Sequence, residues 1–387
     1  MIKYLGSKRR LVPVLSRIAA ATGARSALDL FTGTTRVAQA FKAQGMEVTA
    51  VDTARYAETF ARCYVATDAR CVERRELAAA LAYLDSLPGE PGYVTETFCV
   101  RSRFFQPFNG ERIDAVRETI EREFSGSPLY PVLLTSLIEA ADRVDSTTGV
   151  QMAYVKEWAP RSYRPLELRV PGLLEGTGTA VRGDAVELAG RLGEVDLAYL
   201  DPPYNQHRYF TNYHVWETLV AWDRPAHYGV ACKRVDARDP ATRSPFNSKR
   251  TIRDALAQVV GSLNCTVLVL SYNDESWITP EELTAMCDRF ESVATLGFES
   301  ARYVGARIGI FNPAGRKVGR VSHLTNRELV VVAGPAEAVE RAAGSAAAGG
   351  PFVPRGQRTG RARRGSRPTP PGLRSPAPGP SRPSRPR

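Results

Sequence analysis

The amino-acid sequence predicts an α/β protein with a doubly wound, mostly parallel sheet and a mostly helical segment inserted into it. Three observations lead to this prediction. Apolar strands alternate with amphipathic helices near the start of the chain, as in parallel sheets. The alternation stops between about 65 and 178, where helical patterns dominate, and resumes afterwards. Three apolar strands each end in an aspartate, at Asp29, Asp52 and Asp201.

The first elements alternate regularly. Residues 9–21 have helical spacing, and "SALDLFTG" after them has the apolar pattern of a short strand. The following "TTRVAQAFKAQG" predicts a helix that Thr34 or Thr35 can cap and that Gly45 can close. "MEVTAVD" then predicts a second strand and "ARYAETFARCYV" a second helix. This β-α-β-α order is the start of a doubly wound sheet.

The middle of the chain departs from this order. Its helical patterns cover 73–86, 111–124 and 129–145. A polar stretch rich in aromatic and turn residues follows, "DSTTGVQMAYVKEWAPRSYRP". Such a segment continues a parallel sheet poorly, so we expect residues 65–178 to form an inserted domain.

The sheet pattern returns in the last third of the chain. "TAVRGDAVEL" is expected to rejoin the sheet, and "VDLAYL" and "NCTVLVLSYND" are strongly apolar strands. A helix is expected at 279–289. Late strands, with antiparallel pairing, are expected at 292–299, 302–311 and 326–334.

The positive charge of the chain is concentrated at one end. Residues 351–387 contain ten arginines and no acidic residue, and subtracting these ten from the net charge of +11 leaves +1 for residues 1–350. The overall charge therefore says little about the substrate. We expect the Arg- and Pro-rich tail, 341–387, to be disordered and to attract phosphates at most loosely.

The cysteines and histidines do not form a metal-binding pattern. The six cysteines include no C-x-x-C pair, and the four histidines have no ligand spacing to them, so we expect neither a zinc site nor a disulfide framework. The start of the chain lacks the apolar stretch of a signal peptide, and no apolar run is long enough to span a bilayer. These features favour a soluble, cytoplasmic protein that does not bind membranes.

The strand-terminal aspartates predict a ligand site. Ligands of open α/β sheets bind beyond the carboxyl ends of the strands, where Asp29 and Gly33 form the first turn and Asp52 can accept both hydroxyls of a ribose. Either aspartate alone is better explained as a helix N-cap at a strand–helix turn, whereas the two together favour a ligand. The chain has neither G-x-G-x-x-G nor G-x-x-x-x-G-K-[ST], so a nucleoside ligand without a phosphate clamp fits best. S-adenosylmethionine is the obvious candidate.

The sequence "DPPY" after the third strand has a more specific chemistry. The carboxylate of Asp201 and the backbone carbonyl of Pro202 can accept the two hydrogens of an aromatic exocyclic amine, such as N6 of adenine, and so direct its lone pair at an electrophile. Pro202 and Pro203 hold that carbonyl in a fixed direction, and Tyr204 offers a face on which a base can stack. Chance would place this tetrapeptide in a chain of this length with odds of about 10⁻³.

With these motifs the chain resembles the Dam-like DNA N6-adenine methyltransferases, which use S-adenosylmethionine, over most of residues 1–335. "KYLGSKRRL" resembles the N-terminal cofactor motif of that family, which implies that Tyr4 and Lys8 contact the methionine end of the cofactor. "LDLFTGTTRVA" resembles the first glycine-containing motif and implies that Asp29, Phe31 and Gly33 lie near the cofactor.

The other family motifs follow in order. "AVD" implies that Asp52 binds the ribose, and "RGDAVEL" implies that Asp184 lies beside the cofactor adenine. "DPPYNQHRYFTNYH" resembles the catalytic motif. The first motif departs from the family because Thr34 and Thr35 replace a second glycine, which narrows the approach of the cofactor to the backbone.

The resemblance also implies a domain organisation. Residues 1–64 and 179–340 would form a catalytic domain of Rossmann-like methyltransferase type, and 65–178 the domain that reads double-stranded DNA, from which the adenine is flipped. DNA reading needs basic and amide side chains. The insert supplies several, of which we assign none to a base: Arg101, Arg103, Asn109, Arg112, Gln151, Lys156 and Arg161. The basic loop 233–250 is expected near backbone phosphates, and His207 and Arg208 either meet DNA or face solvent.

Other functions are compatible with parts of this pattern. A methyltransferase for N4 of cytosine or for an RNA base would need nearly the same chemistry, although the Asp before the two prolines favours adenine by resemblance. A DNA-binding relative without catalysis is the alternative from another class, against which the intact Asp29, Asp52 and Asp201 argue. A structural scaffold is a weaker reading still. The sequence determines neither the recognition site nor whether a cognate restriction endonuclease accompanies the protein. It does not determine the oligomeric state either, and it is compatible with a monomer.

Overall fold

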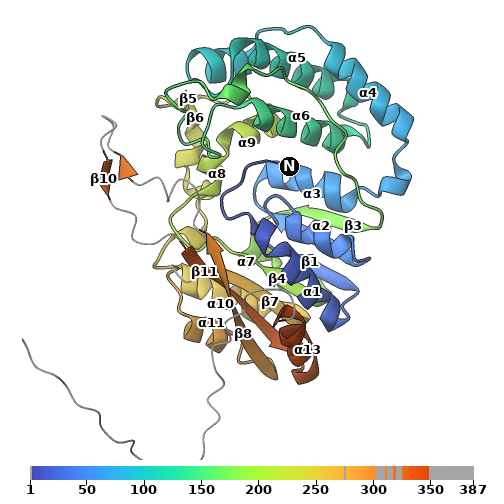
Figure 1. Ribbon diagram of the computed structural model, residues 1–387, viewed down its shortest axis with the longest axis vertical. Helices are drawn as coiled ribbons and strands as arrows, with labels where there is room; N and C mark the ends of the chain where they lie inside the picture. The colour runs from blue at the N-terminus through green and yellow to red at the C-terminus, as the bar shows by residue number, and fades with distance from the viewer. Residues whose placement is uncertain (1, 274–275, 302–309, 312–316, 320–324, 348–387) are drawn as a thin grey trace, which may run out of the picture. The chain divides into compact units, whose positions relative to one another are not determined.

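The protein is built around a seven-stranded sheet (Figure 1). The computed structural model describes residues 2–273, 276–301, 310–311, 317–319 and 325–347. The strands lie in the order β3-β2-β1-β4-β7-β11-β8. Their bounds are Ser26–Asp29 for β1, Glu47–Asp52 for β2, Gly178–Arg182 for β3, Glu194–Leu200 for β4, Asn264–Asn273 for β7, Ser292–Ala301 for β8 and Thr325–Gly334 for β11.

The sheet is mostly parallel, as the sequence predicts. β1 pairs in parallel with β2 on one side and with β4 on the other, so that Asp29 lies opposite both Ala50 and Tyr199. β11 runs antiparallel between β7 and β8, which confirms the expected late antiparallel strands. The strand order reverses between β1 and β4, and ligands of doubly wound folds bind at this switch point.

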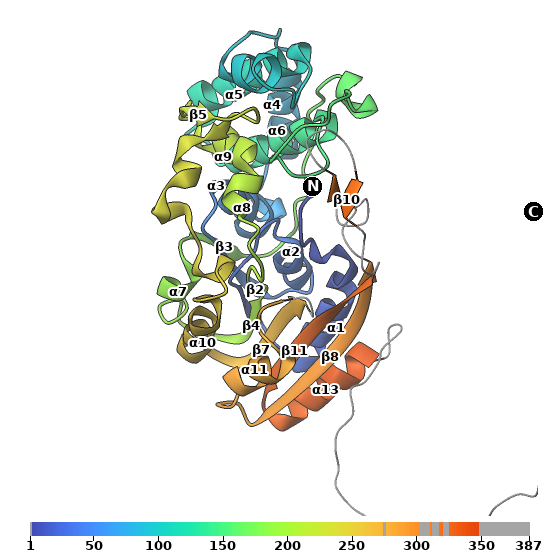
Figure 2. The same ribbon diagram turned by 90° about the vertical axis from the view of Figure 1, so that its left-hand side faces the viewer.

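Helices cover both faces of the sheet (Figure 2). On one face lie α1, α2 and α13, whose apolar side chains pack with Leu197 and Val330 from the strands. On the other lie α7, α10 and α11, which enclose Leu200 and Leu268. The bounds are Val12–Thr22 for α1, Arg36–Lys42 for α2, Ala185–Leu188 for α7, Ile252–Ser262 for α10, Pro280–Met286 for α11 and Ala336–Ala347 for α13.

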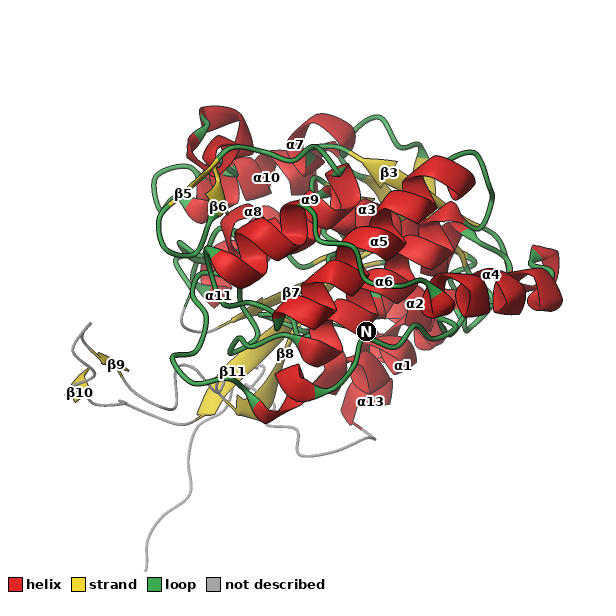
Figure 3. Ribbon diagram, turned by 90° about the horizontal axis from the view of Figure 1, so that it is seen from above, coloured by secondary structure: helices red, strands yellow, loops and turns green. Residues whose placement is uncertain are grey.

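A third cluster of apolar side chains lies mostly on helices, with some residues from loops. Figure 3 shows these helices close together. Three of these helices, α4, α5 and α6, correspond to the helical patterns expected between 73 and 145. The bounds are Arg55–Ala61 for α3, Arg74–Ser86 for α4, Pro107–Phe124 for α5, Tyr130–Val144 for α6 and His214–Ala221 for α9, with π-helical turns η2 at Arg62–Ala66 and η4 at Thr95–Val100. Trp216 of α9 is buried in the same cluster as α4 to α6. The expected boundaries at 65 and 178 therefore do not delimit this core, and a DNA-reading domain between them remains a prediction.

The remaining elements are short. Their bounds are Lys8–Arg10 for η1, Ala69–Cys71 for η3, Pro160–Tyr163 for η5, Tyr209–Asn212 for α8, His227–Tyr228 for β5, Lys233–Arg234 for β6, Val235–Arg238 for η6, Pro240–Thr242 for η7, Pro245–Asn247 for η8, Ile310–Phe311 for β9 and Lys317–Gly319 for β10. The late strand expected at 302–311 lies outside the described residues except for β9. No helix in the described ranges has the length and apolar character needed to cross a membrane.

The structure differs from the expectation that the Arg- and Pro-rich tail begins at residue 341, because helix α13 continues to Ala347. Residues 336–347 form helix α13, in which Ala342 and Ala346 are buried against α1. Arg17 of α1 donates a hydrogen bond to the carbonyl of Ser345, which fixes the last turns. Alanine has the highest helix propensity, and alanines four residues apart give this helix a buried face that the overall composition of the segment does not reveal. The arginine-rich residues 351–387 lie outside the described part of the chain.

The start of α2 also differs from the expectation. The residue before the helix is Thr35, but its side chain does not cap the helix. Its Oγ1 instead donates to the carbonyl of Thr34, 2.7 Å away, and accepts from the side-chain amide of Gln39. Thr35 has φ of 61°, in the left-handed region that favours glycine. The place of a second glycine is thus taken by a buried threonine held by its own hydrogen bonds. Gly45, with φ of 84°, closes the helix as predicted.

Candidate active site

The predicted site residues meet at the carboxyl ends of β1, β2 and β4, around the switch point. A pocket there, open to solvent, contains about 1020 Å³ of space not filled by protein atoms, part of it outside the protein surface. The sequence-predicted residues that line it are Tyr4, Lys8, Asp29, Phe31, Gly33, Asp52, Asp184, Asp201 and Pro203. Beside this lining, Pro202 is buried and Tyr204 packs edge-on against Tyr272, with ring centroids 5.9 Å apart.

The carboxylate of Asp201 is held by an ion pair. The Lys8 ammonium lies 2.9 Å from Oδ1 of Asp201 and 3.5 Å from Oε2 of Glu328, which stands on β11. Asn273 at the end of β7 donates to the other oxygen of Glu328. The side chain of Lys8 is only 6% exposed, so the three charged groups interact with little screening by solvent. Lys8, for which the resemblance implied a cofactor contact, is therefore bound to Asp201 here.

These contacts set the protonation of the site. Burial raises the pKa of Asp201 to about 6, while the Lys8 ammonium opposes the rise and Glu328 adds to it. Burial alone would lower the pKa of Lys8, but the carboxylates of Asp201 and Glu328 outweigh it and hold that pKa well above its usual range. Near pH 7, Lys8 is therefore charged and Asp201 is mostly ionised, as an acceptor of hydrogen bonds must be.

Asp29 is buried and only half satisfied. Thr32 donates to its Oδ2 over 2.9 Å, but its Oδ1 has no hydrogen-bond partner among the described residues. Burial raises the pKa of Asp29 to about 7, and the nearby carboxylates of Asp201 and Asp52 add to the rise. A buried carboxylate oxygen without a donor is costly. It is therefore the position in this pocket where a ligand that carries an N–H donor or a positive charge would be stabilised.

Asp52 orders the turn that faces the ligand space. Its Oδ2 accepts from the backbone amide of Gly33 and its Oδ1 from that of Ala54. Gly33 has φ of 51°, and a Cβ atom there would lie 3.1 Å from Cε1 of Tyr4. Both observations explain the glycine, because a side chain would be strained and would push against the tyrosine. Burial raises the pKa of Asp52, and its backbone hydrogen bonds oppose the rise.

Tyr4 belongs to a stack of aromatic rings that joins the start of the chain to the segment after "DPPY". Its ring stacks on Tyr213 at 4.6 Å and on Tyr209 at 5.4 Å, and its hydroxyl shares a hydrogen bond with Tyr56. The hydroxyl of Tyr213 accepts from the backbone amide of Leu5. These contacts fix the N-terminal segment, and hence Lys8, over the catalytic motif.

Asp184 and Phe31 also line the pocket. Asp184 caps the short helix α7 by accepting from the amide of Val186 over 2.7 Å. Phe31 meets the ring of Phe246 edge-on, with centroids 5.0 Å apart. An aromatic wall and a capped helix start are compatible with a flat nucleobase.

The segment after β6 closes the pocket on the side of the catalytic motif. Arg208 donates to the carbonyl of Ala237 and to the hydroxyl of Thr242, and Asn247 donates to the carbonyls of Asn205 and His207. Part of the basic loop expected at 233–250 is thus bound to the loop that follows Tyr204. His207 itself is exposed.

Sequence reasoning missed several of the residues that form the pocket. They are Arg36, Thr242, Ser244, Phe246, Asn247 and, behind Lys8, Glu328. Glu328 lies in an expected strand but carries no motif. The residues from the 242–247 loop approach the site only through tertiary folding, so no local pattern could have identified them.

Most of the polar side chains considered for DNA reading are engaged within the protein. Asn109 and Gln151 are buried. The side chain of Asn109 bonds to the backbone of 162–166. The side chain of Gln151 bonds to the backbone amide of Val215, and its main chain bonds to Asn212 and His214. Arg103 stacks on Trp158, with its guanidinium 4.7 Å from the ring centroid. The other contacts pair Arg101 with Glu96, Arg112 with Asp85 and Leu87, and Arg161 with Asp145.

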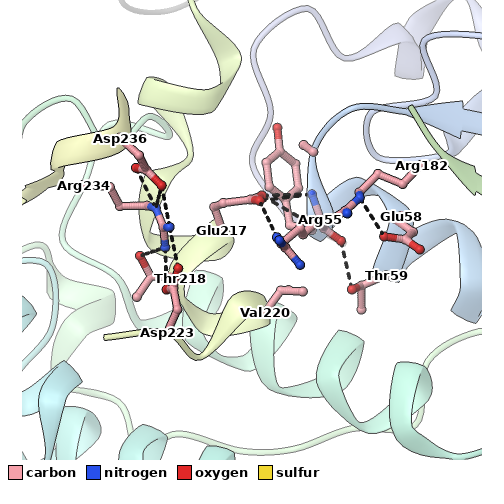
Figure 4. A network of polar contacts seen from close by, with 12 residues as sticks. Arg55, Glu58, Thr59, Arg182, Glu217, Thr218, Val220, Asp223, Arg234 and Asp236 are labelled. Carbon is pink, nitrogen blue, oxygen red and sulfur yellow. Dashed lines mark hydrogen bonds and ion pairs between the residues drawn. The ribbon is translucent and has the colours of Figure 1, made fainter. Parts of the chain in front are cut away.

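A polar network ties α9 to α3 (Figure 4). The buried carboxylate of Glu217 accepts from the backbone amides of Arg55 and Tyr56 at the start of α3. Arg234 of β6 lies between Asp223 and Asp236, to which it donates over 2.6 Å and 2.7 Å. The segment after the catalytic motif is thereby fixed to the strand–helix turn that carries Asp52.

The described part of the chain offers no obvious metal centre. Within those ranges, no group of three or more His, Cys, Asp and Glu side chains is arranged to hold a metal ion, and the six cysteines are free thiols. The carboxylates of the pocket are instead paired with Lys8, with backbone amides or with a hydroxyl.

Two relatives are similar to this chain over about three quarters of its length. The type II methyltransferase M.NlaIII from Neisseria lactamica is 29% identical over 318 residues, which cover 78% of this chain and 92% of the relative. The modification methylase StsI from Streptococcus sanguinis is 28% identical over 307 residues, which cover 75% of this chain and 46% of that protein. This chain therefore spans nearly all of one relative and about half of the other.

Solved structures add less. Precorrin 8W decarboxylase from Methanobacterium thermoautotrophicum aligns over 83% of this chain and 89% of its own, with 11% identity and a TM-score of 0.26. A score this low supports no conclusion, so the fold assignment depends on the strand order itself.

The strongest comparison is with a family model. The model of the D12 class N6 adenine-specific DNA methyltransferases matches residues 4–286, a span that includes Tyr4, Asp29, Asp52 and Asp201. It agrees with the resemblance seen in the sequence and with adenine, rather than cytosine or an RNA base, as the target. The protein belongs to the D12 class of N6 adenine-specific DNA methyltransferases.

Proposed function

We propose that this protein transfers a methyl group from S-adenosylmethionine to N6 of an adenine, at a specific sequence of double-stranded DNA, after the base has left the duplex stack. The observation that carries the proposal is the position of Asp201 and its two prolines. The motif follows β4 at the switch point of the sheet, and its Asp201 and Pro203 line one pocket with Asp29 and Asp52.

The residues of the pocket fit the proposed cofactor. The open Oδ1 of Asp29 can accept from the ammonium of the methionine end, and an ammonium beside this carboxylate would favour its ionised form. Asp52 is already oriented by two backbone amides, and its oxygens keep lone pairs for the ribose hydroxyls. Asp184 and Phe31 would flank the adenine ring. When bound, S-adenosylmethionine supplies a methyl group on a positively charged sulfur.

The acceptor base is oriented by the catalytic motif. Lys8 lies at Oδ1 of Asp201, so we assign the amino hydrogen of adenine to Oδ2 and the second hydrogen to the carbonyl of Pro202. Tyr204, held edge-on by Tyr272, offers the stacking face. Two fixed acceptors favour a pyramidal nitrogen, whose lone pair then points at the methyl group.

The reaction balances without a metal or a covalent enzyme intermediate. The N6–carbon bond forms as the carbon–sulfur bond breaks, and the electron pair of the broken bond stays on sulfur. The nitrogen then carries one proton too many, and the Asp201 carboxylate, with its pKa raised to about 6 by burial, is placed to accept it.

The DNA-reading part is proposed at a coarser level. We assign target recognition to the helical region 65–178 together with the 233–250 loop, because these segments adjoin the motif that receives the base. A modification methylase is the role by which StsI is named. By analogy we propose a cognate restriction endonuclease as a partner.

The test is methyl transfer followed by base and sequence analysis. Purified protein is incubated with labelled S-adenosylmethionine and double-stranded DNA, and the product nucleosides are separated. We expect label in N6-methyladenine, and methylation-sensitive sequencing should place it in one short motif. Label confined to cytosine or to added RNA would contradict the proposal.

A further inference from the structure

Three basic side chains line the pocket, and they differ in how they are used. Lys8 is bound to Asp201 and Glu328 by the ion pairs at 2.9 Å and 3.5 Å. Arg208 donates to the carbonyl of Ala237 at 2.8 Å and to Thr242. Arg36 is the third, and its guanidinium makes no hydrogen bond or ion pair with any residue that the structure describes.

The position of Arg36 makes this lack of partners costly. It is the first residue of α2, directly after the strained Thr35, and it is half-buried. Its Nε is fully buried with no acceptor in the described part of the protein. Buried donors, charged ones above all, are nearly always paired in folded proteins. The pocket therefore holds an unused cation as well as the unused carboxylate oxygen of Asp29.

We propose that Arg36 binds the carboxylate of the methionine end of S-adenosylmethionine, while Asp29 binds the ammonium beside it. This inference deepens the proposed function and depends on it. The methionine end carries one positive and one negative charge on the same carbon. The β1–α2 turn presents the complementary groups, each with an atom that lacks a partner. A guanidinium matches a carboxylate because its N–H groups form a planar fork.

Lys8 is the competing cation for this carboxylate. Its ammonium has three N–H donors and already faces two carboxylates, those of Asp201 and Glu328, so the carboxylate of the cofactor would be a third one sharing a single positive charge. Arg36 can bind that carboxylate without breaking any ion pair within the described residues. The specific contact predicted here is thus with an α-amino acid carboxylate, and ligands without that group should not depend on Arg36.

The experiment compares two ligands by isothermal titration calorimetry. S-adenosylhomocysteine has the carboxylate and the ammonium, whereas 5′-methylthioadenosine keeps the adenosine and the sulfur but lacks both. Arg36→Gln should weaken binding of S-adenosylhomocysteine by about 10- to 100-fold, the usual loss for one charged hydrogen-bonded pair. It should change the affinity for 5′-methylthioadenosine by less than about twofold. Arg36→Lys should fall between the wild type and Arg36→Gln.

The matched control is Arg9→Gln. Arg9 is exposed, and its charge is close enough to Arg36 to contribute to lowering the pKa of that guanidinium, after the larger effect of burial. If a diffuse positive field rather than a contact were responsible, Arg9→Gln would weaken S-adenosylhomocysteine to a similar degree. We expect it to leave both affinities unchanged.

Three outcomes separate the possible failures. Equal losses for both ligands in Arg36→Gln, or no loss for either, would overturn the role of Arg36. A wild-type protein that binds neither ligand would overturn the proposed function itself. If Arg36→Gln does not fold, decarboxylated S-adenosylmethionine tests the same contact on the wild type. Affinity equal to that of S-adenosylmethionine would then overturn the inference, and a loss of about 10-fold or more would support it.

Discussion

The two sides of the pocket treat their charged groups in opposite ways. On the β4 side, comprising Asp201, Lys8 and Glu328, the charges are paired within the protein at 2.9 Å and 3.5 Å. On the β1 side, comprising Asp29, Gly33 and Arg36, a carboxylate oxygen and a guanidinium nitrogen are buried without partners in the described structure. Both sides belong to one pocket of one sheet, and they are close enough for the charge of Asp201 to act on Asp29.

This difference follows from what each side is proposed to bind. An adenine amino group is neutral and is a poor partner for a buried charge, so Asp201 must be kept ionised by the protein before the base arrives. The methionine end of a cofactor brings charges of its own, so the β1 side can remain incomplete until the ligand completes it. On the β4 side the protein pairs the charges before a ligand binds, and on the β1 side the ligand is proposed to pair them. This difference leads to four predictions.

The largest effect is expected from Asp201→Asn. The amide keeps the shape of the carboxylate but cannot accept through both of its terminal atoms, so kcat for methyl transfer should fall by about 10²- to 10³-fold. Binding of S-adenosylhomocysteine, measured by calorimetry, should be largely unchanged. Asp196→Asn is the control, because Asp196 lies at the other end of β4 and bonds to the amides of Arg25 and Ser26. Equal losses in both variants would mean that the damage is to the strand and not to the chemistry.

The β1 side is tested by a matched pair of glycines. Gly33 and Gly45 both have positive φ, at 51° and 84°, but an added Cβ meets Tyr4 at 3.1 Å in the first case and nothing within 4 Å in the second. Ala at either position should cost about 1–2 kcal/mol of folding free energy. Gly33→Ala alone should weaken S-adenosylhomocysteine, by about tenfold. If calorimetry shows that Gly45→Ala weakens S-adenosylhomocysteine equally, the turn at Gly33 is not part of the cofactor site.

The sequence predicted the β1 side better than the β4 side. Asp29, Gly33 and Asp52 follow one another along two adjacent βα units, so strand-end reasoning places them together. The same reasoning found Asp201, whose strand neighbours β1 at the switch point. What holds Asp201 comes from far away in the chain: Lys8 from the N-terminal segment and Glu328 from β11. Their pairing depends on the position of β11 between β7 and β8, which no local pattern encodes.

The helical part was predicted as elements but not as a unit. Periodicity located α4, α5 and α6 because their apolar faces repeat locally. It did not reveal that Trp216 of α9, some seventy residues after α6, is buried in the same core. Nor did it reveal that Asn109 and Gln151 are buried structural residues, because an amide that bonds to the backbone and one that reads a base have the same local sequence signal.

The third prediction concerns the pH dependence of the β4 side. Removing the ammonium with Lys8→Gln should raise the pKa of Asp201 above its value of about 6, because burial would no longer be opposed. Activity needs the ionised carboxylate and rises with pH through this pKa. The acid limb of kcat should therefore move to higher pH, and a shift of one unit would lower activity about tenfold below the limb. Lys8→Arg, which keeps the charge, should restore the limb. A limb that stays in place would show that Lys8 does not act through Asp201.

The smallest effect is expected from Glu328→Gln, and here the direction of the pH shift is the informative result. Glu328 adds to the raised pKa of Asp201, so its neutralisation should move the acid limb to lower pH, opposite to Lys8→Gln and by less than about one unit. Glu337→Gln is the control, because Glu337 on α13 is 90% exposed. A shift of the Glu328→Gln limb to higher pH would mean that Glu328 acts mainly by holding Lys8 in place. The two effects have opposite signs because one carboxylate both repels Asp201 directly and positions the cation that stabilises it. The direction of a shift well under one unit therefore decides which role of Glu328 dominates.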